Sequence, residues 1–166
     1  MRSFFFVLLL AVLILSSFAF AQVSSSQEST TGRLTPDFSG MYTFLQDGEF
    51  VQINVEDQGI VTGFISRFGD LDSDRGAFLD QFLKDGKTDG KKLDFATNQV
   101  HGTWFEFHGV VNRGAGKTPN DDAYFIIQGK LTKYTTDSAK KTSAQSREVT
   151  FKSFPQNAGS DAPKRD

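Results

Sequence analysis

Residues 49–68 read EFVQINVEDQGIVTGFISRF, and this stretch decides the fold. Apolar side chains take every second position from Val51 to Val55, and the same alternation resumes from Val61 to Ile65. A period of two places successive side chains on opposite faces of a strand. The intervening 57–59 (DQG) is a turn signal, because Gly tolerates the positive φ of a tight turn. The stretch therefore predicts a β-hairpin with one buried face.

Further runs of strand type lie on both sides of this hairpin. They cover 41–46, 91–97, 102–112, 123–134 and 147–154, and most are separated by short turn signals. No regular helical repeat separates them, so a parallel α/β sheet is not expected. An antiparallel meander of seven to eight strands can remove its exposed edges by closing on itself. We therefore predict an all-β fold, an up-and-down barrel, with a two-sheet β-sandwich as the alternative.

The segment 77–84 (AFLDQFLK) is the least regular part of the chain. Its apolar residues are Phe78, Leu79, Phe82 and Leu83. This spacing suits a short helical turn as well as it suits a strand, and both interpretations stay open. A polar stretch, 135–146 (TTDSAKKTSAQS), is expected to be a loop.

The chain opens with features of an export signal. Arg2 precedes an apolar block from Phe4 to Leu15, and Ala19-Phe20-Ala21 offers small residues at both positions that a signal peptidase reads. We predict a signal peptide over 1–21, a flexible leader over 22–36, a β-barrel domain over 37–154 and a disordered tail over 155–166. A retained membrane anchor is the alternative, although Ser16 and Ser17 interrupt the apolar run before it reaches the length of a span.

The composition limits which binding partners and which cellular compartment are expected. The chain has no Cys and no N-x-S/T sequon, which favours a secreted or periplasmic protein of bacterial envelope type. The net charge of −2 is mild and mixed, so neither nucleic acid nor a membrane surface is expected as a partner. After signal cleavage we expect no membrane span.

Two motifs suggest bound ions or nucleotides. Gly116-Lys117-Thr118 resembles the end of a phosphate-binding loop, but Val111 stands where that motif needs Gly, so we read it as chance. Asp70, Asp72 and Asp74 place carboxylates at alternate positions, as calcium loops do. Arg75 and Gln81 occupy the places where an EF-hand loop has Gly and Glu, so a looser calcium turn competes with a solvated acidic loop. Calcium is the one cofactor considered.

One cluster contains residue types that catalysis uses. Trp104, Glu106 and His108 share one face of a predicted strand, while Phe105 and Phe107 share the other. If the Phe face is buried, the Trp-Glu-His face lies outside; if the barrel encloses a cavity, one of the two faces must line it. They are the candidate ligand-binding residues, and no catalytic residue is predicted.

The segment Phe38-Ser39-Gly40-Met41-Tyr42, followed by Asp47-Gly48 and later by Gly59-Ile60-Val61-Thr62-Gly63, resembles small calycin-type barrels such as lipocalins and avidins. It departs from both patterns. Gly40-Met41-Tyr42 stands where lipocalins carry Gly-x-Trp, and the chain has one Trp where avidins line their site with several. The resemblance implies a barrel with an interior cavity, and no particular ligand.

Three functions follow in order of preference. The first is a non-enzymatic barrel that binds a small apolar or amphipathic ligand, since apolar pockets are lined by aromatic residues. The second is an interaction or envelope-structural module that contacts another envelope protein through loops 113–122 and 135–146. The third is an enzyme that uses the Glu106/His108 face.

Overall fold

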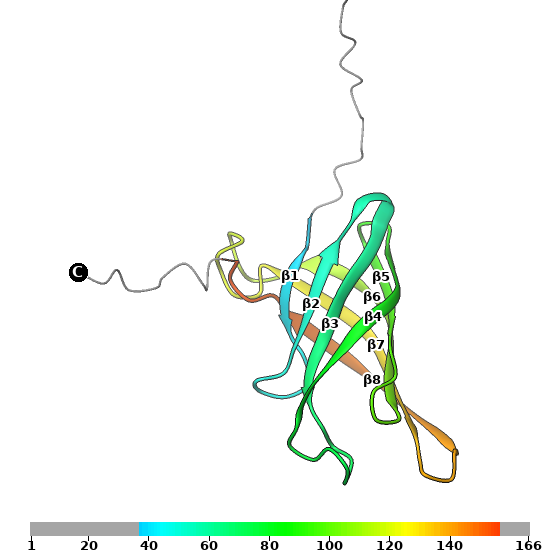
Figure 1. Cartoon of the computed structure of the whole chain (residues 1–166). Coiled ribbons are helices and arrows are strands. Elements are labelled where there is room, and N and C mark those ends of the chain that lie inside the picture. The colour runs from blue at the N-terminus through cyan, green and yellow to red at the C-terminus, as the bar shows by residue number, and fades with distance from the viewer. Residues whose placement is uncertain (1–36, 157–166) are drawn as a thin grey trace, which may run out of the picture. The chain divides into compact units, whose positions relative to one another are not determined.

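The computed structural model describes residues 37–156, and Figure 1 shows their arrangement. The predicted signal peptide 1–21, the leader 22–36 and the tail beyond Gln156 lie outside the described residues. Eight strands form one antiparallel sheet in chain order. They are β1 (Gly40–Thr43), β2 (Phe50–Val55), β3 (Ile60–Phe68), β4 (Phe78–Thr88), β5 (Lys92–Thr97), β6 (Thr103–Arg113), β7 (Phe125–Thr136) and β8 (Thr142–Lys152). The single continuous meander confirms the all-β prediction and leaves no second sheet for the sandwich alternative.

The hairpin predicted from residues 49–68 forms as β2 and β3. A short 3-10 turn, Asp57–Gly59, joins them, and its Gln58 and Gly59 both have positive φ, of 60° and 77°. A Cβ on Gly59 would lie 2.2 Å from the carbonyl oxygen of Thr88, so this position needs glycine for space as well as for φ.

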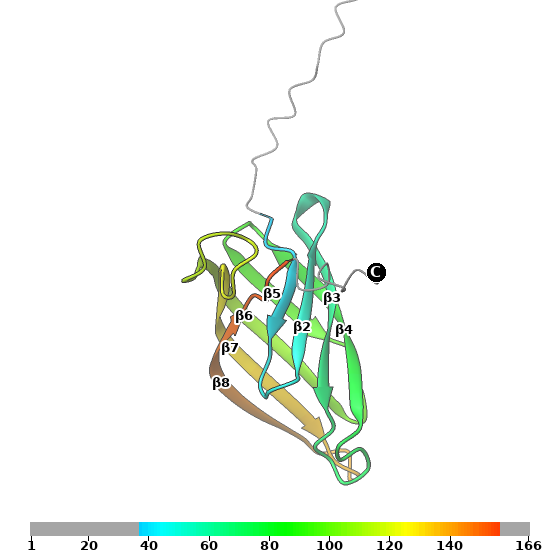
Figure 2. The same ribbon diagram turned by 90° about the vertical axis from the view of Figure 1, so that its left-hand side faces the viewer.

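The sheet curls until its first and last strands meet at one end. Tyr42 of β1 bridges Ser153, and the amide of Phe154 donates to the carbonyl of Met41 at 2.9 Å. β1 has only 4 residues and β8 has 11, so β1 cannot pair with the first half of β8. The barrel is therefore a half-barrel, closed at one end and open along the β1–β8 side at the other (Figure 2).

The segment 77–84 is strand, so the helical-turn alternative is wrong. β4 pairs with β3 along its length and with β5 from Leu83 to Thr88. Phe78 and Phe82 point outward, whereas Leu79 and Leu83 point inward, so apolar residues on both faces produced the helix-like spacing.

The expected loop 135–146 is mostly strand as well. β7 continues to Thr136 and β8 begins at Thr142, in register through the pair Thr136–Thr142. This part of the hairpin extends past the core, so it has no buried face and its residues are polar on both sides. The hydrophobic alternation that would mark a strand is therefore missing.

Inward side chains of all eight strands fill the closed end of the barrel. The largest fully buried ones include Tyr42, Phe107 and Phe151, and Phe38, just before β1, is buried with them. Buried aromatic rings pack at centroid distances such as 5.1 Å for Phe95–Phe107 and 5.3 Å for Phe107–Phe151. This end is solid, so any ligand space must lie toward the open end.

Candidate ligand-binding site

A cavity of about 500 Å³ lies at the open end of the half-barrel. The β1–β2 loop, the end of β3 and the unpaired half of β8 surround it, and β6 and β7 form its floor. Its apolar lining is Leu45, Phe68, Phe105 and Leu131. The volume is within the range of small-molecule sites. The geometry provides an open-sided pocket with an apolar floor.

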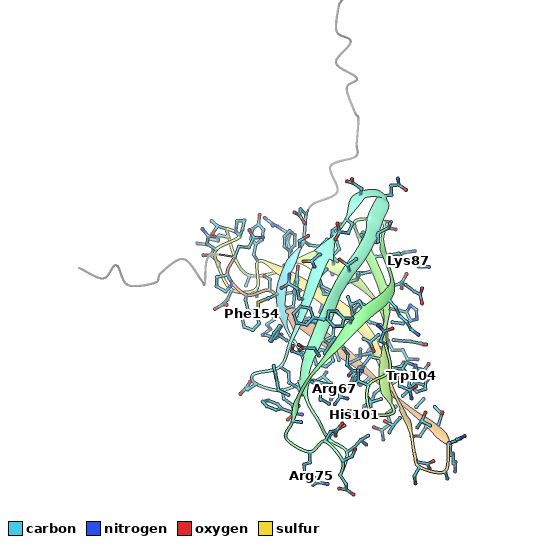
Figure 3. The ribbon with its side chains drawn as sticks, viewed as in Figure 1. Arg67, Arg75, Lys87, His101, Trp104 and Phe154 are labelled. Atoms are coloured by element: carbon cyan, nitrogen blue, oxygen red, sulfur yellow. The ribbon has the colours of Figure 1, made fainter. Side chains whose placement is uncertain are left out.

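Arg67 is a buried cation in the lining of this cavity. It follows Val61 and Ile65 on the inward face of β3, and only 3% of its surface is exposed. Its Nε donates to Oε1 of Gln81 at 2.5 Å, and its Nη1 donates to the carbonyl of Phe68 at 2.9 Å. The guanidinium also lies 5.6 Å from the ring centre of Phe105. Figure 3 shows Arg67 near the end of the barrel that carries the β3–β4 loop.

One nitrogen of that guanidinium has no partner. Nη2 of Arg67 is buried, and no acceptor within residues 37–156 reaches it. A buried donor without an acceptor typically costs about 1–3 kcal/mol, and more when it is charged. Nη2 is therefore an unsatisfied cationic donor that the protein encloses, with less than 1 Å² of exposed surface.

A polar network beneath the cavity fixes Arg67. Gln81 is fully buried on β4, and its amide donates to the carbonyls of Thr103 at 2.9 Å and Asn98 at 3.1 Å. These two bonds orient its Oε1 toward Arg67. The hydroxyl of Thr97 accepts the amide of Phe105 at 3.0 Å and extends the network to β5. The guanidinium is thus held in one orientation before any ligand arrives.

Asp70 and Lys133 form an ion pair at the cavity rim. The ammonium of Lys133 donates to Oδ2 of Asp70, and Nη1 of Arg67 lies 3.5 Å from Oδ1. Partial burial alone would raise the pKa of Asp70, but the charge and hydrogen bond of Lys133, together with Arg67, hold it below the usual range. Asp70 is therefore ionised at neutral pH and cannot serve there as a general acid.

The second acidic residue of the lining is occupied by backbone amides. Glu49 is buried, and its carboxylate accepts from the amide of Phe68 at 3.0 Å and that of Gln46 at 3.1 Å. These bonds fasten the β1–β2 loop to β3. Arg147 of β8 adds a third cation to the lining, which gives three cationic and two acidic side chains. The cavity is net positive in a chain of net charge −2.

The structure places Trp104, Glu106 and His108 on the outer face of β6, away from this cavity. The ring of Trp104 stacks on Tyr134 at 4.9 Å, and the Tyr134 hydroxyl donates to Glu106 at 2.9 Å. Nδ1 of His108 lies 2.7 Å from Oδ1 of Asp94. These residues form cross-strand pairs, and ligand binding by them stays a prediction.

Asp70, Asp72 and Asp74 each meet a different cationic or polar partner. Asp70 pairs with Lys133, and Asp72 lies 2.5 Å from Arg75. Asp74 is buried, accepts the amide of Leu71 at 2.9 Å and lies 3.0 Å from Nδ1 of His101. Residues 37–156 contain no group of three His, Cys, Asp or Glu side chains placed to hold a metal ion. Calcium binding stays a prediction.

Sequence reasoning singled out Asp70 and left open that the face with Phe105 lines a cavity, but it missed the other residues that surround the cavity. Their signal is a polar side chain at an inward position near a strand end: Arg67 after Ile65, Lys133 after Leu131, and Gln81 between Leu79 and Leu83. Such residues break the apolar alternation of the inner face, and this break marks where the filled core stops.

An aromatic ladder lies on the outer face of β2, β3 and β4. It consists of Phe50, Phe64, Phe68, Phe78 and Phe82, with neighbouring ring centres 5.1 to 6.4 Å apart. Phe68, at the end of β3, also borders the cavity. Phe78 and Phe82 are 51% and 61% exposed. The sequence makes aromatic residues candidate lining of an apolar pocket. Several of these Phe side chains lie on the outer surface instead.

A second depression, of about 550 Å³, lies near Met41, Tyr124 and Phe154. Pro155 and Gln156, the last described residues, form part of its wall. The cavity beside Arg67 is bounded by strands and their connecting loops, so it is the better-defined site.

Comparison with known structures gives the class of fold. The chain is similar to rhizavidin in complex with biotin, with a TM-score of 0.52 and 14% identity over 69% of this chain and 98% of that chain. A second rhizavidin crystal structure gives a TM-score of 0.52 and 14% identity over 70% of this chain and 82% of that chain. The fold is thus that of avidin-like calycin barrels. No model of a known protein family matches the sequence, and a search of curated proteins gives no match.

In the part of the chain that the structure describes, no helix has the length and apolar character needed to cross a membrane.

Proposed function

We propose that this protein binds a small amphipathic molecule without transforming it, and that the ligand occupies the cavity beside Arg67. The observation that carries the proposal is the cavity itself. It combines the apolar residues Leu45, Phe105 and Leu131 with charged lining residues whose sum is positive. Such a combination provides burial for an apolar part and a fixed polar contact for orientation.

Two further observations support binding in preference to catalysis. The two carboxylates of the lining, Glu49 and Asp70, are engaged in backbone hydrogen bonds and an ion pair with Lys133, respectively, and Asp70 stays ionised at neutral pH. Proton transfer needs a group whose pKa lies near the operating pH. The avidin-like fold also supports the proposal, because rhizavidin has been solved in complex with biotin.

Native mass spectrometry of the purified protein, followed by organic extraction, tests for a co-purified small molecule. Nile red is a neutral dye that fluoresces in apolar sites. Titration with this dye tests whether the protein has a vacant apolar binding site. We expect either a bound mass adduct or saturable dye binding with one site per chain. A protein that shows neither would contradict the proposed function.

We also propose that the chain is exported and that 1–21 is the signal. Expression of the full chain and of a variant that starts with Met before Gln22 should give a shortened, exported product and a retained product, respectively. If the full chain and the shortened variant are found in the same cell fraction, the proposal of export is contradicted.

A further inference from the structure

We infer that two copies of this chain associate through the aromatic ladder on the outer face of β2, β3 and β4. These three strands run side by side along one wall of the barrel (Figure 1). The partner that fits this wall is a second copy of the chain, whose β4 packs antiparallel against β4 of the first. The contact lies on the outside of the barrel, so it does not depend on the proposed ligand site.

The exposed apolar side chains of the described residues gather on this wall. Six large hydrophobic side chains are exposed among residues 37–156, and four of them belong to the outer face of β1 to β4: Met41, Phe68, Phe78 and Phe82. Phe82 is the most exposed, at 61%. Strand register joins Met41, Gln52, Phe64 and Phe82 in one row across the four strands. Contiguous apolar patches mark interaction sites, whereas single exposed residues do not.

Two charges flank the centre of the ladder on β4. Asp80 and Lys84 stand two positions before and two positions after Phe82, so all three side chains leave the same face of the strand. Asp80 accepts a hydrogen bond from the hydroxyl of Ser66, and neither Asp80 nor Lys84 forms an ion pair among residues 37–156. Four residues along a strand span about 13 Å, so these two charges are too far apart to pair with each other.

A two-fold axis that crosses β4 at Phe82 makes this face complementary to itself. In an isologous contact the same patch meets itself. With the axis in the plane of the contact and perpendicular to β4, the two β4 strands run in opposite directions. Phe82 then meets Phe82 of the second copy, and Asp80 meets Lys84 of the other copy twice, once on each side of the axis. A parallel alignment would oppose Asp80 to Asp80 and Lys84 to Lys84, which like-charge repulsion disfavours. The charges therefore select the antiparallel dimer.

The size of the face sets the strength of the dimer. Stable interfaces bury about 800 Å² on each partner. The ladder is only three strands wide, and two of its five rings, Phe50 and Phe64, are half-buried among their neighbours. The dimer is therefore weak, with a dissociation constant of about 10–100 µM, and the chain is a monomer in dilute solution.

Sedimentation equilibrium of the purified protein from roughly 1 µM to 1 mM tests the association. Wild type should follow a monomer–dimer equilibrium, and Phe82→Ser should weaken it by at least about tenfold. If circular dichroism shows that Phe82→Ser is unfolded, Phe78→Ser, on the same face, takes its place. Wild-type protein that stays monomeric over the whole range would overturn the inference and leave the face to a different partner. Unchanged association of a folded Phe82→Ser protein would overturn it as well.

Charge reversal tests the antiparallel alignment. Asp80→Lys and Lys84→Asp each oppose like charges twice, so each should weaken the dimer by at least about tenfold. The double variant Asp80→Lys/Lys84→Asp opposes unlike charges again and should return to within about threefold of wild type. Lys130→Asp reverses an exposed charge on the outer face of β7 and should leave association unchanged. A folded double variant that associates as weakly as the single variants, or single variants that associate like wild type, would overturn the alignment.

Discussion

Arg67 occupies a position that the alternation of β3 assigns to the interior, yet it is charged. The pattern Val61, Gly63, Ile65 is sufficient to predict which face is inward, and the burial of Val61 and Ile65 confirms it. The pattern does not say where along the strand the filled core ends. That depends on the lengths of β1 and β8, which lie far apart in the sequence.

Gly63 is the residue on which the β2–β3 packing depends most. Its φ is +141°, and a Cβ there would lie 1.9 Å from the carbonyl oxygen of Gln52. Gly40 offers a matched control, because its φ is +152° and a Cβ there meets nothing within 4 Å. We expect Gly63→Ala to lower the free energy of unfolding by about 1–3 kcal/mol more than Gly40→Ala, as overpacking does. Urea unfolding of both variants measures this difference. Equal losses of unfolding free energy in Gly63→Ala and Gly40→Ala would show that the backbone at Gly63 shifts to accept a Cβ.

Tyr42 makes stability depend on alkaline pH. Burial, and then the charge of Asp37, raise the pKa of its hydroxyl, which donates to the carbonyl of Phe38 at 2.5 Å. A raised pKa gives stability that is complete below the unfolded value of about 10 and is lost as pH rises above it. We expect Tyr42→Phe to cost about 0.5–1.5 kcal/mol at neutral pH, with the difference from wild type shrinking above about pH 10. If the free energies of unfolding of wild type and Tyr42→Phe differ by the same amount from neutral pH to above about pH 10, this account is contradicted.

At the scale of single elements, strands with one apolar face are predictable and strands without one are not. β2, β3, β5 and β6 lie close to their expected ranges because their inward positions are apolar. β4 has apolar residues on both faces, and the first half of β8 has them on neither. Their strand character is set by pairing with neighbours, which a local pattern does not contain.

The free edge of β8 should be visible by hydrogen exchange. No described strand pairs with residues 142–147 on the side opposite β7, whereas β7 is paired on both sides. Alternate amides of 142–147 have no partner strand, so we expect them to exchange near the free-peptide rate, while amides of β7 at 125–131 stay protected. Exchange measured by NMR checks this. Uniform protection across β8 would mean that the edge is covered in solution and that the cavity has no open side.

The outer aromatic ladder contributes little to folding. Phe78 and Phe82 are more than half exposed, so little of their apolar surface is buried. We expect Phe82→Ser to change the free energy of unfolding by less than about 1 kcal/mol and to increase solubility. Thermal unfolding and a solubility titration measure both effects. Phe107→Ser, at a fully buried position, is the contrasting variant and should be strongly destabilising.

At the scale of the whole molecule, the barrel class could be predicted and the position of the cavity could not. Short turns and antiparallel alternation indicated a meander that closes, and the similarity to rhizavidin agrees with this fold. The cavity arises because a 4-residue β1 faces an 11-residue β8, so that closure stops before the open end. The β8 edge of the opening, residues 142–147, has no large apolar side chain, which discourages pairing with another chain.

The central claim is that this open-sided cavity is the ligand site, and a blocking variant tests it most directly. Gln145 is an exposed cavity residue on β8, and Glu148 is exposed on the outward face of the same strand. Nile red affinity should fall by at least about tenfold in Gln145→Trp and stay within about twofold of wild type in Glu148→Trp. Wild-type affinity in a folded Gln145→Trp protein would contradict the claim.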